Sequence, residues 1–250
     1  MQLNFRIIGA EGSTILFIHG FLENTTMWDK LTTDFSDFRV VLVDLPGHGS
    51  SPDVPNYSLA ELAETIWNSA ALEGCPLQAV VGHSLGGYVA LALAKLGFEK
   101  NAPIDKVVLL NSHPWADSET KKEDRNTVAR LVKQDKDSFL RQAIPALFLK
   151  DANLNSIIQQ YISDAQMMSS DAIIAATYAM RDRPDQTAIM KKMGEGLTVI
   201  QGEQDHLIPA NEMEHFCLSN GNNYHLIKNA GHMCHEEKPQ ETAMLMSEIL

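Results

Sequence analysis

The stretch Val80-Val81-Gly82-His83-Ser84-Leu85-Gly86-Gly87-Tyr88 joins two segments of different character. The apolar run at residues 78–81 is typical of a strand, and the alanine- and leucine-rich run at residues 88–95 is typical of a helix. Ser84 then stands on a tight turn, where Gly82 and Gly86 avoid side-chain collisions. A Gly-x-Ser-x-Gly sequence between a strand and a helix predicts a nucleophile elbow, which presents the serine hydroxyl at the end of the strand.

The composition is typical of a folded enzyme with an acidic surface. Of the 250 residues, 44% are hydrophobic and 21% are charged, with a formal net charge of −12. A chain of this length buries roughly 70–75% of its unfolded surface, so its core needs no disulfides. Because phosphate backbones and anionic lipids bind basic surfaces, the charge argues against a nucleic-acid or membrane partner.

The cysteines and the N-terminus give no sign of an exported or metal-binding protein. Cys75, Cys217 and Cys234 are widely spaced, which fits neither a disulfide framework nor a zinc site, and we expect reduced thiols. No Cys, His and carboxylate group has metal-ligand spacing, so no metal or other cofactor is expected. The sequence has no signal-peptide pattern and no apolar run that spans a bilayer, so we expect a cytoplasmic protein.

Short apolar runs alternate with helical segments along most of the chain. Strands are predicted at residues 5–9, 14–18, 39–43, 78–81, 106–111, 197–202 and 224–227. Several are apolar without alternation, as in strands buried on both faces. The pattern predicts an α/β fold: a mostly parallel sheet with helices on both faces.

The alternation stops after Ser112 and resumes near Leu197. Helices are predicted in between at residues 123–132, 136–149, 154–163 and 170–180, and a closing helix at 236–250. We therefore expect an all-helical cap, residues 114–193, inserted into an α/β core of residues 1–113 and 194–250.

Two late loops supply partners for the serine. Asp205 follows the strand at residues 197–202, and His232 follows the strand at 224–227. A serine hydroxyl needs a base to take its proton and a carboxylate to orient that base. Open parallel sheets place such groups at the carboxyl ends of their strands. The sequence therefore predicts a Ser84, Asp205 and His232 triad, in that chain order.

With these motifs, the sequence from His19-Gly20 to Gly231-His232 resembles the α/β-hydrolase superfamily, in particular its small serine esterases with a helical cap. The resemblance implies that Ser84 is the nucleophile, His232 the general base and then acid, and Asp205 the orienting carboxylate. It also implies an oxyanion hole formed by the backbone N–H groups of Leu85 and Phe21.

Other residues compete for these roles. His235 is the rival of His232 and Glu203 the rival of Asp205, while His83 is expected to point away from the serine. Candidates for the wall of a substrate pocket are Trp28, Trp115, Met167 and Arg181. The alternative for each is an ordinary packing or surface role.

Three functions fit this constellation. The first is a serine hydrolase that cleaves a small-molecule carboxylic ester through an acyl-enzyme. The second is a lyase that uses the same triad for elimination, as in the menaquinone-pathway succinyl-cyclohexadiene synthases, although Tyr88 stands where those enzymes tend to carry a basic residue. The third is a non-catalytic ligand receptor. Neither the substrate nor the oligomeric state follows from the sequence.

Overall fold

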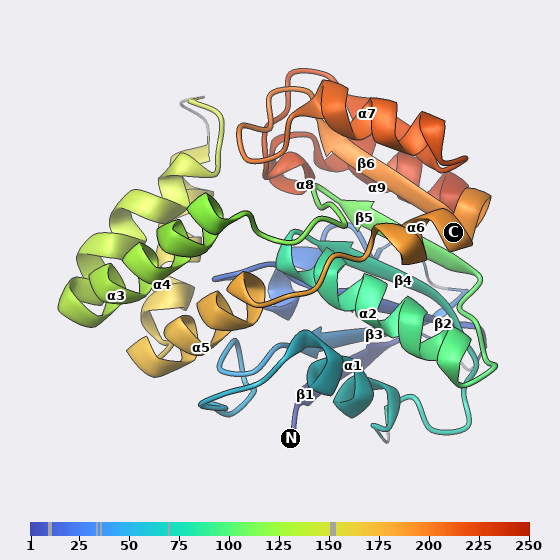
Figure 1. Ribbon diagram of the computed structural model, residues 1–250, viewed down its shortest axis with the longest axis horizontal. Coiled ribbons are helices and arrows are strands. Elements are labelled where there is room, and N and C mark those ends of the chain that lie inside the picture. Colours follow the sequence, from blue (N-terminus) through green and yellow to red (C-terminus); the bar gives the residue numbers. More distant parts are fainter. Residues whose placement is uncertain (10–11, 34, 36, 70, 151–153) are drawn as a thin grey trace.

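The computed structural model describes residues 1–9, 12–33, 35, 37–69, 71–150 and 154–250, and its centre is a seven-stranded sheet (Figure 1). The strand order is β1-β3-β2-β4-β5-β6-β7, and each neighbouring pair is parallel except β1 with β3. The strands are β1 (Asn4–Ile8), β2 (Thr14–Ile18), β3 (Arg39–Asp44), β4 (Leu77–His83), β5 (Lys106–Leu110), β6 (Leu197–Gly202) and β7 (Asn223–Ile227). The predicted mostly parallel sheet is confirmed.

The central strands are buried on both faces because helices cover both. In β2, Leu16 and Ile18 belong to one apolar cluster, whereas Ile15 and Phe17 belong to another. The first cluster is covered chiefly by α1 (Leu59–Trp67), α2 (Leu85–Glu99) and α7 (Ala210–Ser219). The second is covered by the 3-10 helix η1 (Thr25–Trp28) and by α9 (Pro239–Ile249).

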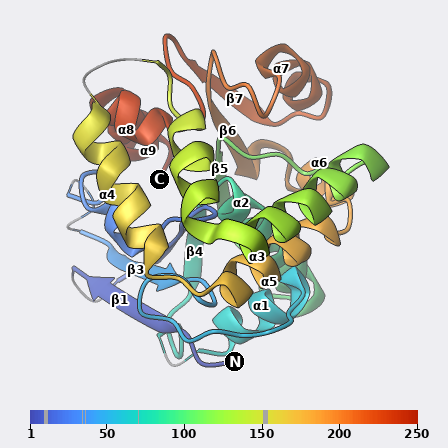
Figure 2. The same cartoon turned by 90° about the vertical axis from the view of Figure 1, so that its left-hand side faces the viewer.

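A block of helices separates β5 from β6 in the sequence. It comprises α3 (Glu119–Ala146), α4 (Asn155–Gln166), α5 (Ser170–Arg181) and α6 (Thr187–Met193), followed by the short η3 (Gly194–Gly196). The first three, which we call the inserted helices, pack on one another around an apolar cluster of their own. Figure 2 shows them in front of the sheet, while α6 lies against α2.

The longest helix, α3, contains a break at Asp135, where φ is −156° and ψ is 88°. The Asp135 carboxylate accepts a hydrogen bond from the Ser138 N–H, at 3.0 Å, and so caps the second half of the helix. The sequence prediction of two helices, residues 123–132 and 136–149, with a boundary between them agrees with this break.

The end of the chain differs from its prediction as one closing helix. The structure has a short α8 (Cys234–Glu237) and then α9, with Lys238 in a non-helical conformation between them. The cause is Pro239, which is the first residue of α9. A proline disfavours the helical conformation in the residue before it, so the helix must restart.

No helix among the described residues is both long and apolar enough to cross a bilayer.

Candidate active site

The serine of the opening motif lies on a strained turn between β4 and α2. Ser84 has φ 48° and ψ −111°, a conformation that non-glycine residues rarely adopt. A Cβ atom on Gly82 would lie 2.3 Å from the Gly86 carbonyl oxygen, and one on Gly86 would lie 2.1 Å from the Ile18 carbonyl oxygen. Both positions therefore require glycine for the serine to reach this place.

The structure brings Ser84, His232 and Asp205 into one hydrogen-bonded chain. Ser84 Oγ lies 3.0 Å from His232 Nε2, and His232 Nδ1 lies 2.9 Å from Asp205 Oδ2. The serine follows β4, the aspartate follows β6 and the histidine follows β7, so the carboxyl ends of three parallel strands supply the three groups.

Asp205 is held as a buried carboxylate by several donors. The Asn111 side chain donates to its Oδ2 at 2.8 Å, and the Leu207 N–H donates to its Oδ1 at 2.9 Å. Burial alone would raise the pKa of Asp205, but its electrostatic attraction to the His232 ring, the hydrogen bond from His232 and the bond from Asn111 lower it below its ordinary value. An ionised carboxylate accepts the Nδ1–H of His232, which leaves Nε2 as the acceptor for the serine hydroxyl proton.

In the loop after β2, the backbone N–H group of Phe21, a residue that lines the same cavity as Ser84, is left without an acceptor by its neighbours among the described residues. The Gly20 N–H donates to Glu23 at 2.5 Å, and the Leu22 N–H donates to His48 Nε2 at 3.3 Å. Within the described part of the chain, the Phe21 N–H between them has no acceptor. Leu85 is the first residue of α2, where a backbone N–H has no partner in its own helix. These two N–H groups are the predicted oxyanion-hole donors, and among the described residues neither has an acceptor.

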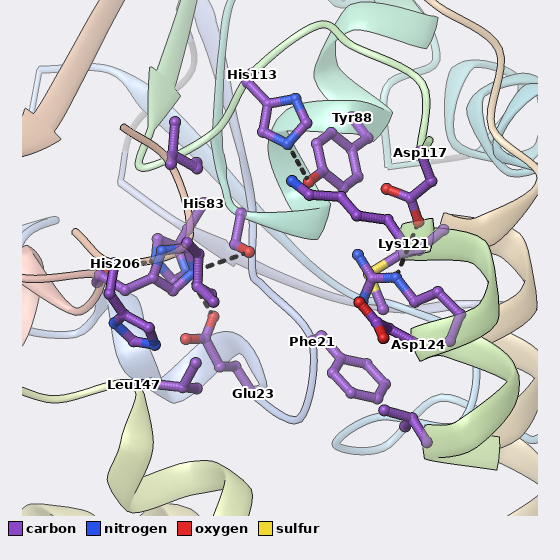
Figure 3. A pocket seen from close by; sticks show the side chains of 17 residues that line it. Phe21, Glu23, His83, Tyr88, His113, Asp117, Lys121, Asp124, Leu147 and His206 are labelled. Carbon is purple, nitrogen blue, oxygen red and sulfur yellow. Dashed lines mark hydrogen bonds and ion pairs between the residues drawn. The ribbon is translucent and has the colours of Figure 1, made fainter. Parts of the chain in front are cut away.

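A second buried charge pair joins these segments. Glu23 Oε2 lies 2.9 Å from His83 Nδ1 (Figure 3). His83 Nε2 lies 3.0 Å from the His232 carbonyl oxygen. Burial alone would raise the pKa of Glu23, but the charge and hydrogen bond of His83 hold it at about 2. Burial would lower the pKa of His83, yet the Glu23 charge raises it. Because both nitrogens of His83 face oxygen acceptors, the Glu23 carboxylate and the His232 carbonyl, both donate and the ring is an imidazolium.

Glu23, His83 and His235 form the one group of candidate metal ligands found among the described residues, with ligand atoms within 4.8 Å of one another. Two of these atoms are already joined by the Glu23–His83 hydrogen bond. Burial lowers the pKa of His235 far below its ordinary value, so this third imidazole is neutral. We interpret the group as an ion pair beside a neutral histidine.

The rival residues lie away from the serine. His235 is buried, with its Nε2 3.3 Å from the Tyr161 hydroxyl, and the Glu203 carboxylate accepts the Asn229 N–H at 3.0 Å. His83 bonds Glu23 and the His232 backbone instead of the serine. Burial raises the pKa of the Cys234 thiol, which makes it a poor nucleophile.

A cavity of about 370 Å³ opens above Ser84 and His232, near the lower end of the size range of ligand pockets (Figure 3). Its wall includes α3 through Lys121, Asp124, Arg125 and Val128, and the core through Phe21, Glu23, Tyr88 and His113. The remaining lining is mostly apolar, with Leu147, Met180, Leu207 and Ile208, so the cavity joins Ser84 and His232 to a charged wall across an apolar surface.

The four residues proposed from the sequence for the pocket wall do not line this cavity. Trp28 is buried against Phe17, with ring centroids 5.2 Å apart, and Met167 is 87% exposed at the end of α4. Trp115 stacks on the ring of His113, with centroids 5.0 Å apart, and Arg181 pairs with Asp182. These residues were proposed because they follow a strand or lie in the predicted helical cap, and such a position in the sequence does not determine the direction of a side chain.

The cavity residues that the sequence interpretation missed include the charged residues Glu23, Lys121 and Arg125. Lys121 and Arg125 are four residues apart, a spacing that places both on one face of a helix. That spacing is visible in the sequence, but only the packing of α3 shows that this face covers the serine.

Comparisons with known proteins identify the family of the chain. A model of the alpha/beta hydrolase family matches residues 15–245. The 2-succinyl-6-hydroxy-2,4-cyclohexadiene-1-carboxylate synthase of Citrobacter koseri is 26% identical over 252 residues, which cover 97% of this chain and 96% of that protein.

Solved structures of esterases superpose on most of the chain. A thermophilic esterase from Thermogutta terrifontis, with malate bound, is 27% identical with a TM-score of 0.87, over 98% of this chain and 92% of that one. An esterase from Exiguobacterium antarcticum is 20% identical with a TM-score of 0.85, over 99% and 95% of the two chains, a likeness in fold.

Proposed function

Because the chain belongs to the alpha/beta hydrolase family, we propose that it is a serine hydrolase that cleaves a small-molecule carboxylic ester through an acyl-enzyme. The observation that supports this most directly is the hydrogen-bonded chain from Ser84 through His232 to Asp205 at the floor of the cavity. The likeness to the Thermogutta terrifontis esterase over 98% of the chain agrees with it.

The first half of the reaction forms the acyl-enzyme. Ser84 Oγ attacks the ester carbonyl carbon while His232 Nε2 takes the hydroxyl proton, and Asp205 stabilises the resulting imidazolium. The N–H groups of Leu85 and Phe21 bind the oxyanion of the tetrahedral intermediate. The intermediate collapses, the bond to the alcohol oxygen breaks, and His232 donates the proton to the departing alcohol.

The second half repeats these steps with water. His232 takes a proton from a water molecule that attacks the acyl carbon, and the second tetrahedral intermediate releases the acid and restores Ser84. In this proposal the chain consists of a core of residues 1–113 and 194–250 and a cap of residues 114–193. The inserted helices belong to the cap, cover the site and determine which ester fits.

The nucleophile is tested by replacing Ser84 with alanine. We expect Ser84→Ala to abolish turnover of p-nitrophenyl acetate and labelling by an organophosphonate, because no other group replaces the serine oxygen. Ser247→Ala, an exposed serine on α9, is the matched control and should retain both. Full activity in a pure Ser84→Ala preparation would show that the nucleophile is another residue.

A lyase reaction is the second candidate, because the Citrobacter koseri synthase matches the chain over nearly its whole length. Formation of 2-succinyl-6-hydroxy-2,4-cyclohexadiene-1-carboxylate from its biosynthetic precursor, with no hydrolysis of simple esters, would favour that reaction. Saturable binding of a small ligand without turnover of any substrate would instead favour a receptor.

A further inference from the structure

One end of the cavity carries hydrogen-bond donors that have no acceptor. Lys121 lines it and, among the described residues, its ammonium makes no ion pair or hydrogen bond. In Figure 3 the Lys121 side chain runs across the cavity toward Tyr88 and His113. Arg125, one turn further along α3, donates from Nε to Asp117 at 3.0 Å, and its two terminal nitrogens have no partner in the described part of the chain.

The tautomer of His113 makes the hydroxyl group of Tyr88 a third free donor at this end of the cavity. Burial, and then the charges of Arg183, Lys121 and Arg125, lower the pKa of His113 far below its ordinary value, so the ring is neutral. Its Nδ1 accepts the Trp115 N–H at 3.2 Å, so the ring proton is on Nε2.

Tyr88 is therefore the acceptor in its contact with His113. His113 Nε2–H donates to the Tyr88 hydroxyl oxygen at 3.1 Å, which leaves the hydroxyl proton of Tyr88 unused. Tyr88 is only 7% exposed, and it lines the cavity together with His113 and Lys121. A buried hydroxyl donor without an acceptor is unfavourable until a ligand supplies one.

The charged side chains at this end of the cavity have a net formal charge of +1. Asp117 is shared between Arg125 Nε, at 3.0 Å, and Arg183 Nη1, at 2.7 Å, so one carboxylate faces two guanidinium groups. Lys121 adds a positive charge and the exposed Asp124 a negative one. A singly charged carboxylate balances this excess, whereas a dianionic phosphate exceeds it.

We propose that this chain acts on esters that also carry a carboxylate group, which binds to the Tyr88 hydroxyl, the Lys121 ammonium and the Arg125 guanidinium. The inference rests on the proposed function, because it assigns the substrate class of the same cavity. The cavity that holds both Ser84 and this anion subsite also has an apolar lining, which includes Phe21, Leu147 and Met180 and suits a short hydrocarbon segment between the scissile ester and the carboxylate.

Matched esters test the charge preference on either side of the scissile bond. On the acyl side, p-nitrophenyl hydrogen succinate is compared with its uncharged isostere p-nitrophenyl isocaproate. On the alcohol side, m-acetoxybenzoate is compared with m-isopropylphenyl acetate. We expect kcat/KM to favour the anionic ester of at least one pair by about tenfold, as for one charge-assisted hydrogen bond.

Two variants assign the preference to the subsite. Lys121→Met should lower the ratio of anionic to neutral kcat/KM by about tenfold, and Tyr88→Phe, which removes only the hydroxyl, should lower it by a smaller factor. Lys122→Met is the matched control, because Lys122 pairs with Glu119 and does not line the cavity, and it should leave the ratio unchanged. Neutral esters that react as well as anionic ones in both pairs would overturn the proposal.

A binding measurement separates the subsite from the chemistry. Calorimetry with monomethyl succinate, which carries one carboxylate and cannot be cleaved by a variant without the serine, on Ser84→Ala should show binding that weakens about tenfold when Lys121→Met is added. Binding of this kind without any ester hydrolysis would support the subsite and reject the serine hydrolase. Ester hydrolysis with no charge preference and no binding of monomethyl succinate would reject the subsite and leave the hydrolase in place.

Discussion

The buried Glu23–His83 pair connects three segments that each carry part of the candidate site. Glu23 accepts the Gly20 N–H of the loop with Phe21, His83 immediately precedes Ser84, and His83 donates to the carbonyl of His232. Breaking a buried ion pair by removing one charge is costly, because the remaining charge has neither water nor a partner. We therefore assign to this pair the positioning of the loops around the serine.

Loss of the Glu23 charge should destabilise the protein in a pH-dependent way. The fall of the Glu23 pKa from 4.5 to about 2 corresponds to a contribution on the order of 3 kcal/mol at neutral pH. Because the folded-state pKa is the lower one, this contribution is complete above pH 4.5 and is lost as the pH falls toward 2. Urea unfolding should show Glu23→Gln less stable than the parent at pH 7, with the difference closing over that interval.

Glu64→Gln is the control for this measurement, because Glu64 lies on the exposed face of α1. It should change the free energy of unfolding by less than about 0.5 kcal/mol. A Glu23→Gln penalty that stays constant down to pH 2 would mean that packing, and not the charge, is what the substitution removes.

Among the helices and strands, those with strong local signals were predictable from the sequence. The apolar runs of β2 and β3, and the Gly-x-Ser-x-Gly turn before α2, needed no tertiary information. The restart of the last helix at Pro239 could also be predicted from local sequence, because a proline acts on the residue before it, here Lys238. By contrast, the direction of Trp28 depends on its packing against Phe17, which no local pattern records.

The elbow imposes a constraint on the contact between α2 and β2. A Cβ atom on Gly86 would meet the Ile18 carbonyl oxygen at 2.1 Å, and this backbone belongs to a central strand with neighbours on both sides. We expect Gly86→Ala to lower the free energy of unfolding by about 3 kcal/mol or more, measured by urea denaturation and soluble yield. Gly12→Ala, whose new Cβ would find its nearest atom at 3.6 Å, should change stability by less than about 0.5 kcal/mol. If both substitutions lowered the free energy of unfolding equally, the cause would be the replacement of a glycine as such and not the clash with the Ile18 carbonyl.

Across the whole molecule, the site depends on contacts between residues that are far apart in the sequence. The contact between Ser84, Asp205 and His232 was predictable because each follows a strand, and the ends of parallel strands meet at one edge. Their supporting residues were not predictable: Glu23 is 60 residues from His83, and Asn111 is 94 residues from Asp205. Which loop side chain meets which is decided by how the loops pack, and that information is absent from local patterns.

The assignment of the acid is the sharpest test of this long-range arrangement, because Asp205 and Glu203 follow the same strand, β6. Only Asp205 contacts the histidine, at 2.9 Å, whereas Glu203 bonds the Asn229 backbone near the surface. Asp205→Asn should keep the fold, as judged by circular dichroism, and slow kcat on p-nitrophenyl acetate by up to about 10⁴, because an amide cannot stabilise the imidazolium or fix its tautomer. Glu203→Gln should leave kcat within about twofold, since a surface substitution away from the site has little effect. A larger loss in Glu203→Gln than in Asp205→Asn would mean that the loop after β6 rearranges in the working enzyme and presents the other carboxylate to His232.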